Sequence, residues 1–105
     1  MTEEIYIFPK IGKFAEDKDE ARKIRVDRIL PTLEKGERII IDFREVEFST
    51  QSYIHALIGE ALMQYHDEVL DKIEFRHCSP QLQNIIELVV NYSLGGFPEK
   101  KQGTK

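Results

Sequence analysis

The side chains with the most evident chemistry in this sequence are a run of hydroxyls and a histidine beside a cysteine. The string Ser49-Thr50-Gln51-Ser52 offers several oxygens that can accept hydrogen bonds from the first amides of a helix. His77 precedes Cys78, a pairing that could supply a base and a thiol nucleophile. Adjacent strand residues point to opposite faces, so these two side chains can pair only if the chain turns there. We therefore expect no enzyme activity and a packing role for the lone cysteine.

No set of side chains has the spacing of a metal or cofactor site. His55 and His66 are eleven positions apart, about three helical turns, so they share a helix face but stand too far apart to bind one ion. No glycine-rich phosphate loop or nucleophile elbow is present. We expect neither a metal nor a cofactor. Cys78 is the single cysteine, which excludes an intramolecular disulfide and fits a reducing cytoplasm.

Four basic side chains, Arg22, Lys23, Arg25 and Arg28, are close together in the sequence. On a helix they would crowd its exposed side, and such a charge run is usually a solvated face. An alternative is a weak contact with an anion or nucleic acid. The formal net charge of −4 argues against a general nucleic-acid binder, because phosphate neutralisation needs an excess of clustered Lys and Arg.

The elements that must position these residues begin with a strand over Ile5–Phe8, a β-branched and aromatic run. Lys13–Ala15 either adds a second strand or leads into a helix. Asp17 followed by Glu20 has the form of a capping box, which predicts a helix start. Pro31 removes an amide, so it should kink or divide this helix before Gly36.

The second half alternates strands and helices. Arg38–Asp42 contains adjacent isoleucines, which predicts a central strand with both faces covered. After Ser52 a long helix should bury one stripe, formed by Ile54, Leu57, Ile58, Ala61, Leu62 and Tyr65. Lys72–Arg76 predicts a strand with one buried face. A last helix should follow, with Ser79 as its cap and Pro80 as its first residue, and Gly95-Gly96 should end it.

The composition fits one globular domain. The chain has 105 residues, 41% of them hydrophobic and 32% charged, enough for a modest core. We expect a single domain over residues 1–98 and a flexible tail over 99–105, which has no apolar anchor. The alternation of elements predicts an α/β fold with a mixed, largely parallel sheet and helices packed against it. Neither a secretory signal nor a membrane span is evident, so we expect a cytoplasmic protein.

Two stretches resemble the sulphate-transporter and anti-sigma-antagonist (STAS) domain, and more closely its STAS-like relatives of unknown function. The first is Ile39-Ile40-Ile41-Asp42-Phe43-Arg44-Glu45-Val46-Glu47-Phe48-Ser49-Thr50-Gln51-Ser52-Tyr53, and the second runs from Cys78-Ser79-Pro80 through Leu88 to Ser93-Leu94-Gly95. The match spans roughly residues 39–96. The chain ends before the final strand and helix of longer members, so the resemblance implies a version of the fold trimmed at its C-terminus.

In the anti-sigma antagonists, a serine at the start of the matching helix is phosphorylated by a partner kinase, and the modification abolishes binding. Ser52 is the matching hydroxyl. The sequence departs from the family pattern where Thr50 and Gln51 replace an Asp-Ser pair and Tyr53 replaces a glycine. The resemblance implies a protein partner of the histidine-kinase-like ATPase class.

The resulting hypothesis is a non-enzymatic, protein-binding regulatory module, possessing a phosphorylation switch at the helix start. Its phosphorylation candidates are Ser52, Thr50 and Ser49, and its partner-binding candidates are Gln51, Tyr53 and His55. One alternative is that the three hydroxyls are merely helix caps. Another is a structural subunit of a larger assembly without a switch.

Overall fold

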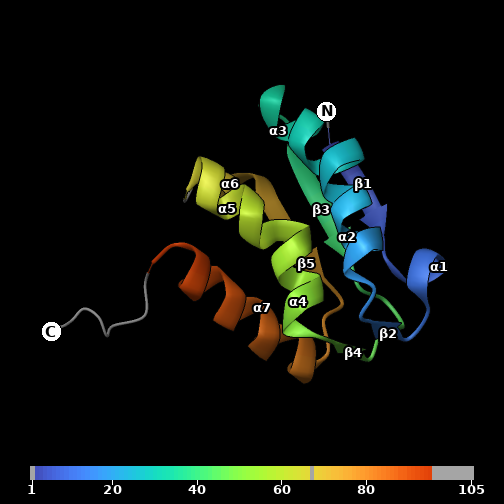
Figure 1. Ribbon diagram of the computed structural model, residues 1–105. Coiled ribbons are helices and arrows are strands. Elements are labelled where there is room, and N and C mark those ends of the chain that lie inside the picture. The colour runs from blue at the N-terminus through green and yellow to red at the C-terminus, as the bar shows by residue number, and fades with distance from the viewer. Residues whose placement is uncertain (1, 67, 96–105) are drawn as a thin grey trace, which may run out of the picture.

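A computed structural model describes residues 2–66 and 68–95 (Figure 1). The strands are β1 (Thr2–Tyr6), β2 (Phe14–Ala15), β3 (Arg38–Asp42), β4 (Phe48–Ser49) and β5 (Ile73–Arg76). The helices are α1 (Phe8–Ile11), α2 (Lys18–Ile24), α3 (Leu30–Glu34), α4 (Gln51–Ile54), α5 (Glu60–Tyr65), α6 (Glu68–Lys72) and α7 (Pro80–Ser93). Two π-helical segments, η1 (Arg25–Ile29) and η2 (His55–Gly59), join α2 to α3 and α4 to α5. The predicted tail over residues 99–105 lies outside the described part of the chain.

The strands form two parallel sheets, which confirms the predicted α/β class with helices packed against a largely parallel sheet. One sheet has the order β1-β3-β5, and β2 pairs with β4 in a separate two-stranded ribbon. The expected strand over Arg38–Asp42 is therefore the central one.

Within residues 2–66 and 68–95, no helix is both long and apolar enough to cross a membrane.

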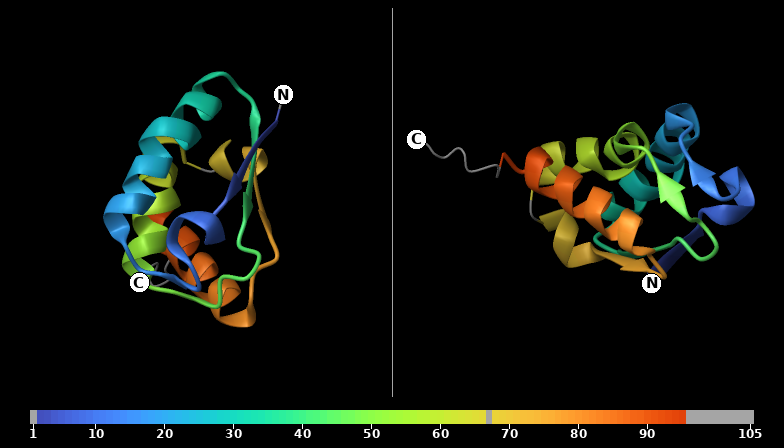
Figure 2. Two further views of the ribbon diagram at one scale, coloured as in Figure 1. Left: turned by 90° about the vertical axis from the view of Figure 1, so that its right-hand side faces the viewer. Right: turned by 90° about the horizontal axis from the view of Figure 1, so that it is seen from below.

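The long helices cover only one face of the three-stranded sheet, so the prediction that both faces of the isoleucine strand are covered was wrong. Figure 2 (left) shows α2, α4, α5 and α7 on the same side of the strands. Ile39 and Ile41 are completely buried, whereas Ile40 points the other way and is only half-buried. Its partners in the register are Glu4 and Glu74, both exposed. These carboxylates keep the outer face hydrated.

The first strand lies earlier than Ile5–Phe8. It ends at Tyr6, and Phe8–Ile11 forms the helical turn α1, because Pro9 fits the first turn of a helix, where its missing amide costs nothing. Lys13–Ala15 was left open between a strand and a helix lead-in. The structure places Phe14 and Ala15 in β2, and their partners Phe48 and Ser49 are remote in the sequence.

The helix that starts after Asp17 is not divided at Pro31. Asp17 accepts hydrogen bonds from the amides of Asp19 and Glu20, which confirms the predicted cap. Ahead of Pro31 the chain widens into η1, in which the Leu30 amide bonds to the Arg25 carbonyl. The helical path then continues to Glu34. The expected kink thus takes the form of a wider turn that accommodates the missing amide.

Two members of the basic cluster make internal contacts, so the prediction that all four crowd the exposed side was wrong. The Arg25 side chain is buried; it donates a 2.7 Å hydrogen bond to the Ala56 carbonyl and lies 3.1 Å from a Glu60 oxygen. Arg28 pairs with Glu3 at 2.7 Å. Only Arg22 and Lys23 of the four are exposed. Arg25 therefore links η1 to η2 and the start of α5, and these bonds satisfy its buried guanidinium.

Candidate protein-binding surface at the start of helix α4

The three candidate hydroxyls have three different surroundings. The Thr50 side chain accepts a 3.0 Å hydrogen bond from the Tyr53 amide, so Thr50 is the helix cap. Ser49 is buried, and its Oγ lies 3.1 Å from the Ala15 carbonyl to which it donates. Ser52, the second residue of α4, is exposed. The interpretation that all three are caps therefore holds only for Thr50.

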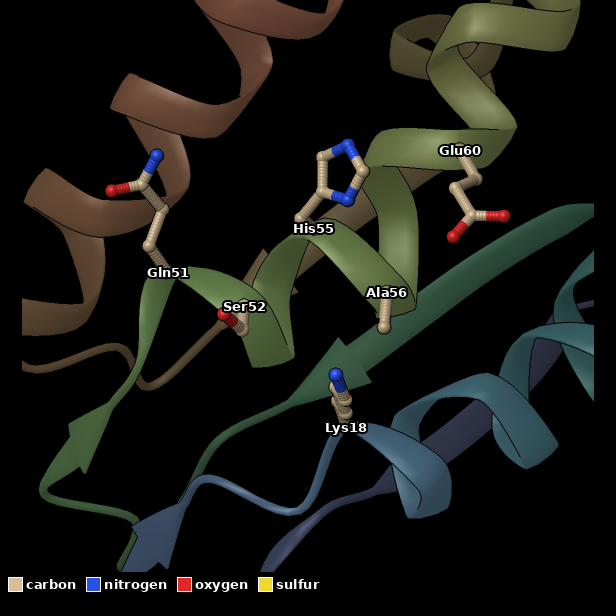
Figure 3. A pocket seen from close by; sticks show the side chains of 6 residues that line it. All are labelled: Lys18, Gln51, Ser52, His55, Ala56 and Glu60. Atoms are coloured by element: carbon tan, nitrogen blue, oxygen red, sulfur yellow. The ribbon is translucent and has the colours of Figure 1, made fainter.

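Ser52 opens onto a shallow surface hollow of about 430 Å³ beside the helix start (Figure 3). We call it the α4 hollow. It is lined by Lys18, Gln51, Ser52, His55, Ala56 and Glu60. Lys18 comes from the neighbouring helix α2, and the other side chains come from α4, η2 and α5 (Figure 3). The structure thus brings three predicted site residues, Gln51, Ser52 and His55, to one surface.

Charges of both signs border the α4 hollow. Lys18 supplies a positive group at one side, and Glu60 supplies a carboxylate held 3.1 Å from the buried Arg25 guanidinium. The start of a helix adds partial positive charge from its unpaired amides. The end of the hollow near Ser52 is therefore the one suited to a negative group.

Gly59 allows His55 to take its place in this surface. A Cβ atom at position 59 would lie 2.6 Å from Cδ2 of His55, closer than real Cβ atoms come, and would make a tight 3.0 Å contact with Oγ of Ser93. Four residues of this surface were not predicted from the sequence: Gly59, Lys18, Ala56 and Glu60. A glycine inside a helical pattern costs about 1 kcal/mol relative to alanine, and that cost was the available signal of a close approach.

Tyr53 does not belong to the partner-facing surface, so its assignment as a partner-binding residue is corrected. Its side chain is completely buried, next to Ile54 on the inward side of the helix. Burial raises the pKa of its hydroxyl, and the negative charges of Glu20 and Asp17 add to that shift. The hydroxyl has no hydrogen-bond partner among the described residues. Tyr53 anchors the helix start to the core.

His77 is directed at Asp42, not at its neighbour Cys78. Nδ1 of His77 lies 3.0 Å from a carboxylate oxygen of Asp42, a nearly buried residue at the end of β3. Burial by itself would raise the pKa of Asp42, but hydrogen bonds from the Arg44 amide and His77 lower the pKa below its ordinary value. Burial and the Asp42 charge raise the pKa of the Cys78 thiol to about 11. This junction therefore lacks a thiol activated by its neighbouring histidine.

Helix α7 begins on the outer edge of β4. The Ser79 side chain caps the Leu82 amide, as predicted, and also donates to the Glu47 carbonyl. The side-chain amide of Gln81 accepts from the Ser49 N–H at 3.1 Å and donates to the Ser49 carbonyl at 3.3 Å. These bonds replace those of a further strand, so α7 closes this edge of the β2-β4 ribbon.

Comparison with family models places this arrangement in a known group. Residues 20–83 match the model described as a STAS-like domain of unknown function (DUF4325). The chain belongs to this family. A search of the curated proteins and a search of the solved structures gave no match.

The STAS-like match includes every element that builds the α4 hollow except the first residues of α2. It begins at residue 20 and ends at 83, whereas the resemblance in the sequence was placed over roughly 39–96. The family match therefore also covers most of α2, whereas the resemblance seen in the sequence began only at β3. Within residues 2–66 and 68–95, no group of three or more His, Cys, Asp or Glu is arranged to hold a metal ion.

Proposed function

We propose that this STAS-like domain is a non-enzymatic regulatory module that binds a protein partner through Gln51, Ser52 and His55, and that phosphorylation of Ser52 switches the binding off. The observation that carries the proposal is the different use of the hydroxyls at the helix start. Thr50 caps the helix and Ser49 is buried, whereas Ser52 is exposed on the α4 hollow. Thr50 is exposed as well, but its oxygen accepts the Tyr53 amide, so Ser52 is the exposed hydroxyl that a kinase can modify without disturbing the cap.

The electrostatics of the α4 hollow support a switch that leaves the fold intact. A phosphate on Ser52 adds about −1.5 to −2 charges at pH 7. At the second residue of α4 this charge meets the unpaired amides of the helix start, and Lys18 lines the same hollow. The domain therefore tolerates the phosphate, while a partner that contacts Gln51 and Ser52 meets a changed charge.

The partner proposed is a histidine-kinase-like ATPase, the class that the resemblance to anti-sigma antagonists implies. A shallow surface with mixed charges suits contact with another folded protein better than capture of a small molecule, which needs a concave, mostly apolar cavity. The surroundings of Cys78 support a role without catalysis, because its thiol pKa of about 11 leaves little thiolate at neutral pH.

The decisive experiment compares partner recovery by variants of Ser52. Tagged wild-type domain, Ser52→Ala and Ser52→Glu are used to capture proteins from the native cell, and recovered proteins are quantified by mass spectrometry. We expect equal recovery of the partner by wild type and Ser52→Ala, and at least about a tenfold loss with Ser52→Glu, because an introduced carboxylate imitates part of the phosphate charge. Peptide mapping of the domain from the same cells should find phosphate on Ser52.

Gln64→Glu is the matched control, because it adds the same charge at an exposed position of α5 that does not line the α4 hollow. It should leave recovery unchanged. The double variant Gln51→Ala/His55→Ala tests the surface itself and should also lose the partner. Undiminished recovery by Ser52→Glu would point to a structural subunit without a switch, and undiminished recovery by the double variant would exclude this surface.

A further inference from the structure

A second feature of the surface lies on the ribbon formed by β2 and β4, away from the three-stranded sheet (Figure 1). Phe14 and Phe48 are partners in its register, and their rings stack at 5.5 Å between centroids with planes 10° apart. They are 54% and 46% exposed, whereas the opposite pair, Ala15 and Ser49, is buried. An exposed stacked aromatic pair on a strand ribbon leaves apolar area in water that an interface would remove.

The two edges of this ribbon differ. The β4 edge is closed by Gln81, which bonds both the N–H and the carbonyl of Ser49. On β2, the carbonyls of Lys13 and Ala15 accept from the Phe48 and Thr50 amides, so they point toward β4. In a parallel pair alternate residues point the other way, so the N–H and carbonyl of Phe14 face outward. The ribbon therefore presents one edge that another strand can join.

The outward edge of β2 borders a second hollow, of about 390 Å³, whose charged residues are divided by sign along the chain; Lys13 also lies 3.9 Å from the exposed Glu47. Lys10 and Lys13 lie before Phe14 in the chain, and Glu16 and Glu20 lie after it; all four line this hollow. A twofold axis near Phe14 would place the lysine end of one copy against the acidic end of the other, twice over. Such self-complementarity is what an isologous dimer interface requires.

We infer that the β2 edge, with Phe14 and Phe48, is a docking surface for a second copy of this chain. The two β2 strands pair antiparallel through the outward Phe14 backbone groups, the aromatic side chains cover one another, and the lysine and glutamate ends form ion pairs between copies. The inference is independent of the switch at Ser52. The surface is small, so the dimer forms weakly and in a salt-dependent way.

The test is the mass of the untagged chain in sedimentation and light-scattering measurements over a concentration series up to about 1 mM. We expect the mass to rise from 12.3 kDa toward twice that value. Phe14→Ser should abolish the rise; because the side chain is exposed, the fold should persist by circular dichroism. A chain that stays monomeric throughout the series overturns the inference.

Charge reversal identifies the interface without changing the core. Lys10→Glu/Lys13→Glu and Glu16→Lys/Glu20→Lys should each weaken self-association at least about tenfold, because each places like charges together twice. An equimolar mixture of the two variants should form a heterodimer, since every facing pair is again opposite in sign. Dimerisation of each variant as strong as that of the wild type, or no heterodimer in the mixture, contradicts this interface. If the wild type is monomeric and Phe14→Ser instead loses the protein partner, the surface belongs to that partner and the inference fails.

Discussion

Helices α4 and α7 begin with the same chemistry and use it differently. Thr50 accepts from the Tyr53 amide at 3.0 Å, and Ser79 accepts from the Leu82 amide at 3.2 Å. The residues that follow Ser79 are fastened to the ribbon, because Gln81 bonds both backbone groups of Ser49. Gln51 and Ser52, which follow Thr50, are exposed and line the α4 hollow.

The difference comes from what lies opposite each helix start. Helix α7 begins beside the outer edge of β4, whose backbone groups need partners, so its polar side chains are used for structure. Helix α4 continues directly from β4 and packs against α2 and α7, but Gln51 and Ser52 at its start are exposed, so their polar side chains are available for a partner. A hydroxyl-rich helix start thus indicates function only when no unpaired backbone lies within its reach.

The exposed start of α4 can present a binding surface only if the helix that carries it is firmly packed, and Arg25→Met tests that packing. The substitution removes the 2.7 Å hydrogen bond from Arg25 to the half-buried Ala56 carbonyl and the ion pair with Glu60. We expect the free energy of unfolding to fall by about 2–4 kcal/mol in urea titrations. Arg22→Met, at an exposed position of the same helix, should change it by less than about 0.5 kcal/mol. Equal losses of stability in the two variants would mean that the contacts of Arg25 with Ala56 and Glu60 do not stabilise the fold.

The start of α7 is also held in place by Asp42, whose carboxylate contacts His77 just before this helix. Asp42→Asn should cost about 1.5–3 kcal/mol at pH 7, because the carboxylate accepts charge-assisted bonds from the Arg44 amide and His77. The folded pKa lies below the ordinary 3.8, so this stabilisation is present above about pH 4 and is lost as the pH falls through the folded pKa. Urea titrations should therefore show wild type and variant converging in acid. A difference independent of pH would show that the charge of Asp42 is not what stabilises the junction.

Two glutamines, one near the start of each helix, should differ in their effect on stability. Gln81→Leu removes both bonds to the Ser49 backbone and should lower the free energy of unfolding by about 1–2 kcal/mol. Gln51→Leu, at an exposed position one residue past the other cap, should change it by no more than about 0.5 kcal/mol. Thermal unfolding of the two proteins under one condition provides the measurement. Comparable losses would mean that both helix starts serve structure.

Patterns local in the sequence were sufficient for the elements with strong periodicity or caps. Asp17 and Ser79 cap the helices predicted for them, and Arg38–Asp42 is the strand expected. The class of fold followed from the order of these elements. What the sequence could not predict depends on contacts between distant segments, such as the pairing of Phe14 with Phe48.

The sequence predicted the segment 49–55 as the candidate site, but it did not predict which of its side chains reach the surface. Ser52, Gln51 and His55 do share a surface, but a helix turns by about 100° per residue, so Tyr53 points to the core. Lys18 and Glu60 come from other helical turns and could not be placed without the packing of α2 on α4. The basic cluster was misjudged for the same reason, because only tertiary contact shows that Arg25 is buried.

The smallest expected changes in stability distinguish Thr50, the cap of α4, from Ser52, the proposed switch. Thr50→Ala removes the oxygen that accepts from the Tyr53 amide and should lower the free energy of unfolding by about 1 kcal/mol. Ser52→Ala leaves the cap in place at an exposed position, so it should change stability by less than about 0.5 kcal/mol. Both can be measured by urea titration at pH 7, with Ser79→Ala as the reference for a cap that also bonds the Glu47 carbonyl just before β4. If Ser52→Ala costs as much as Thr50→Ala, Ser52 is itself part of the cap, and modifying it would unfold the helix start instead of switching it.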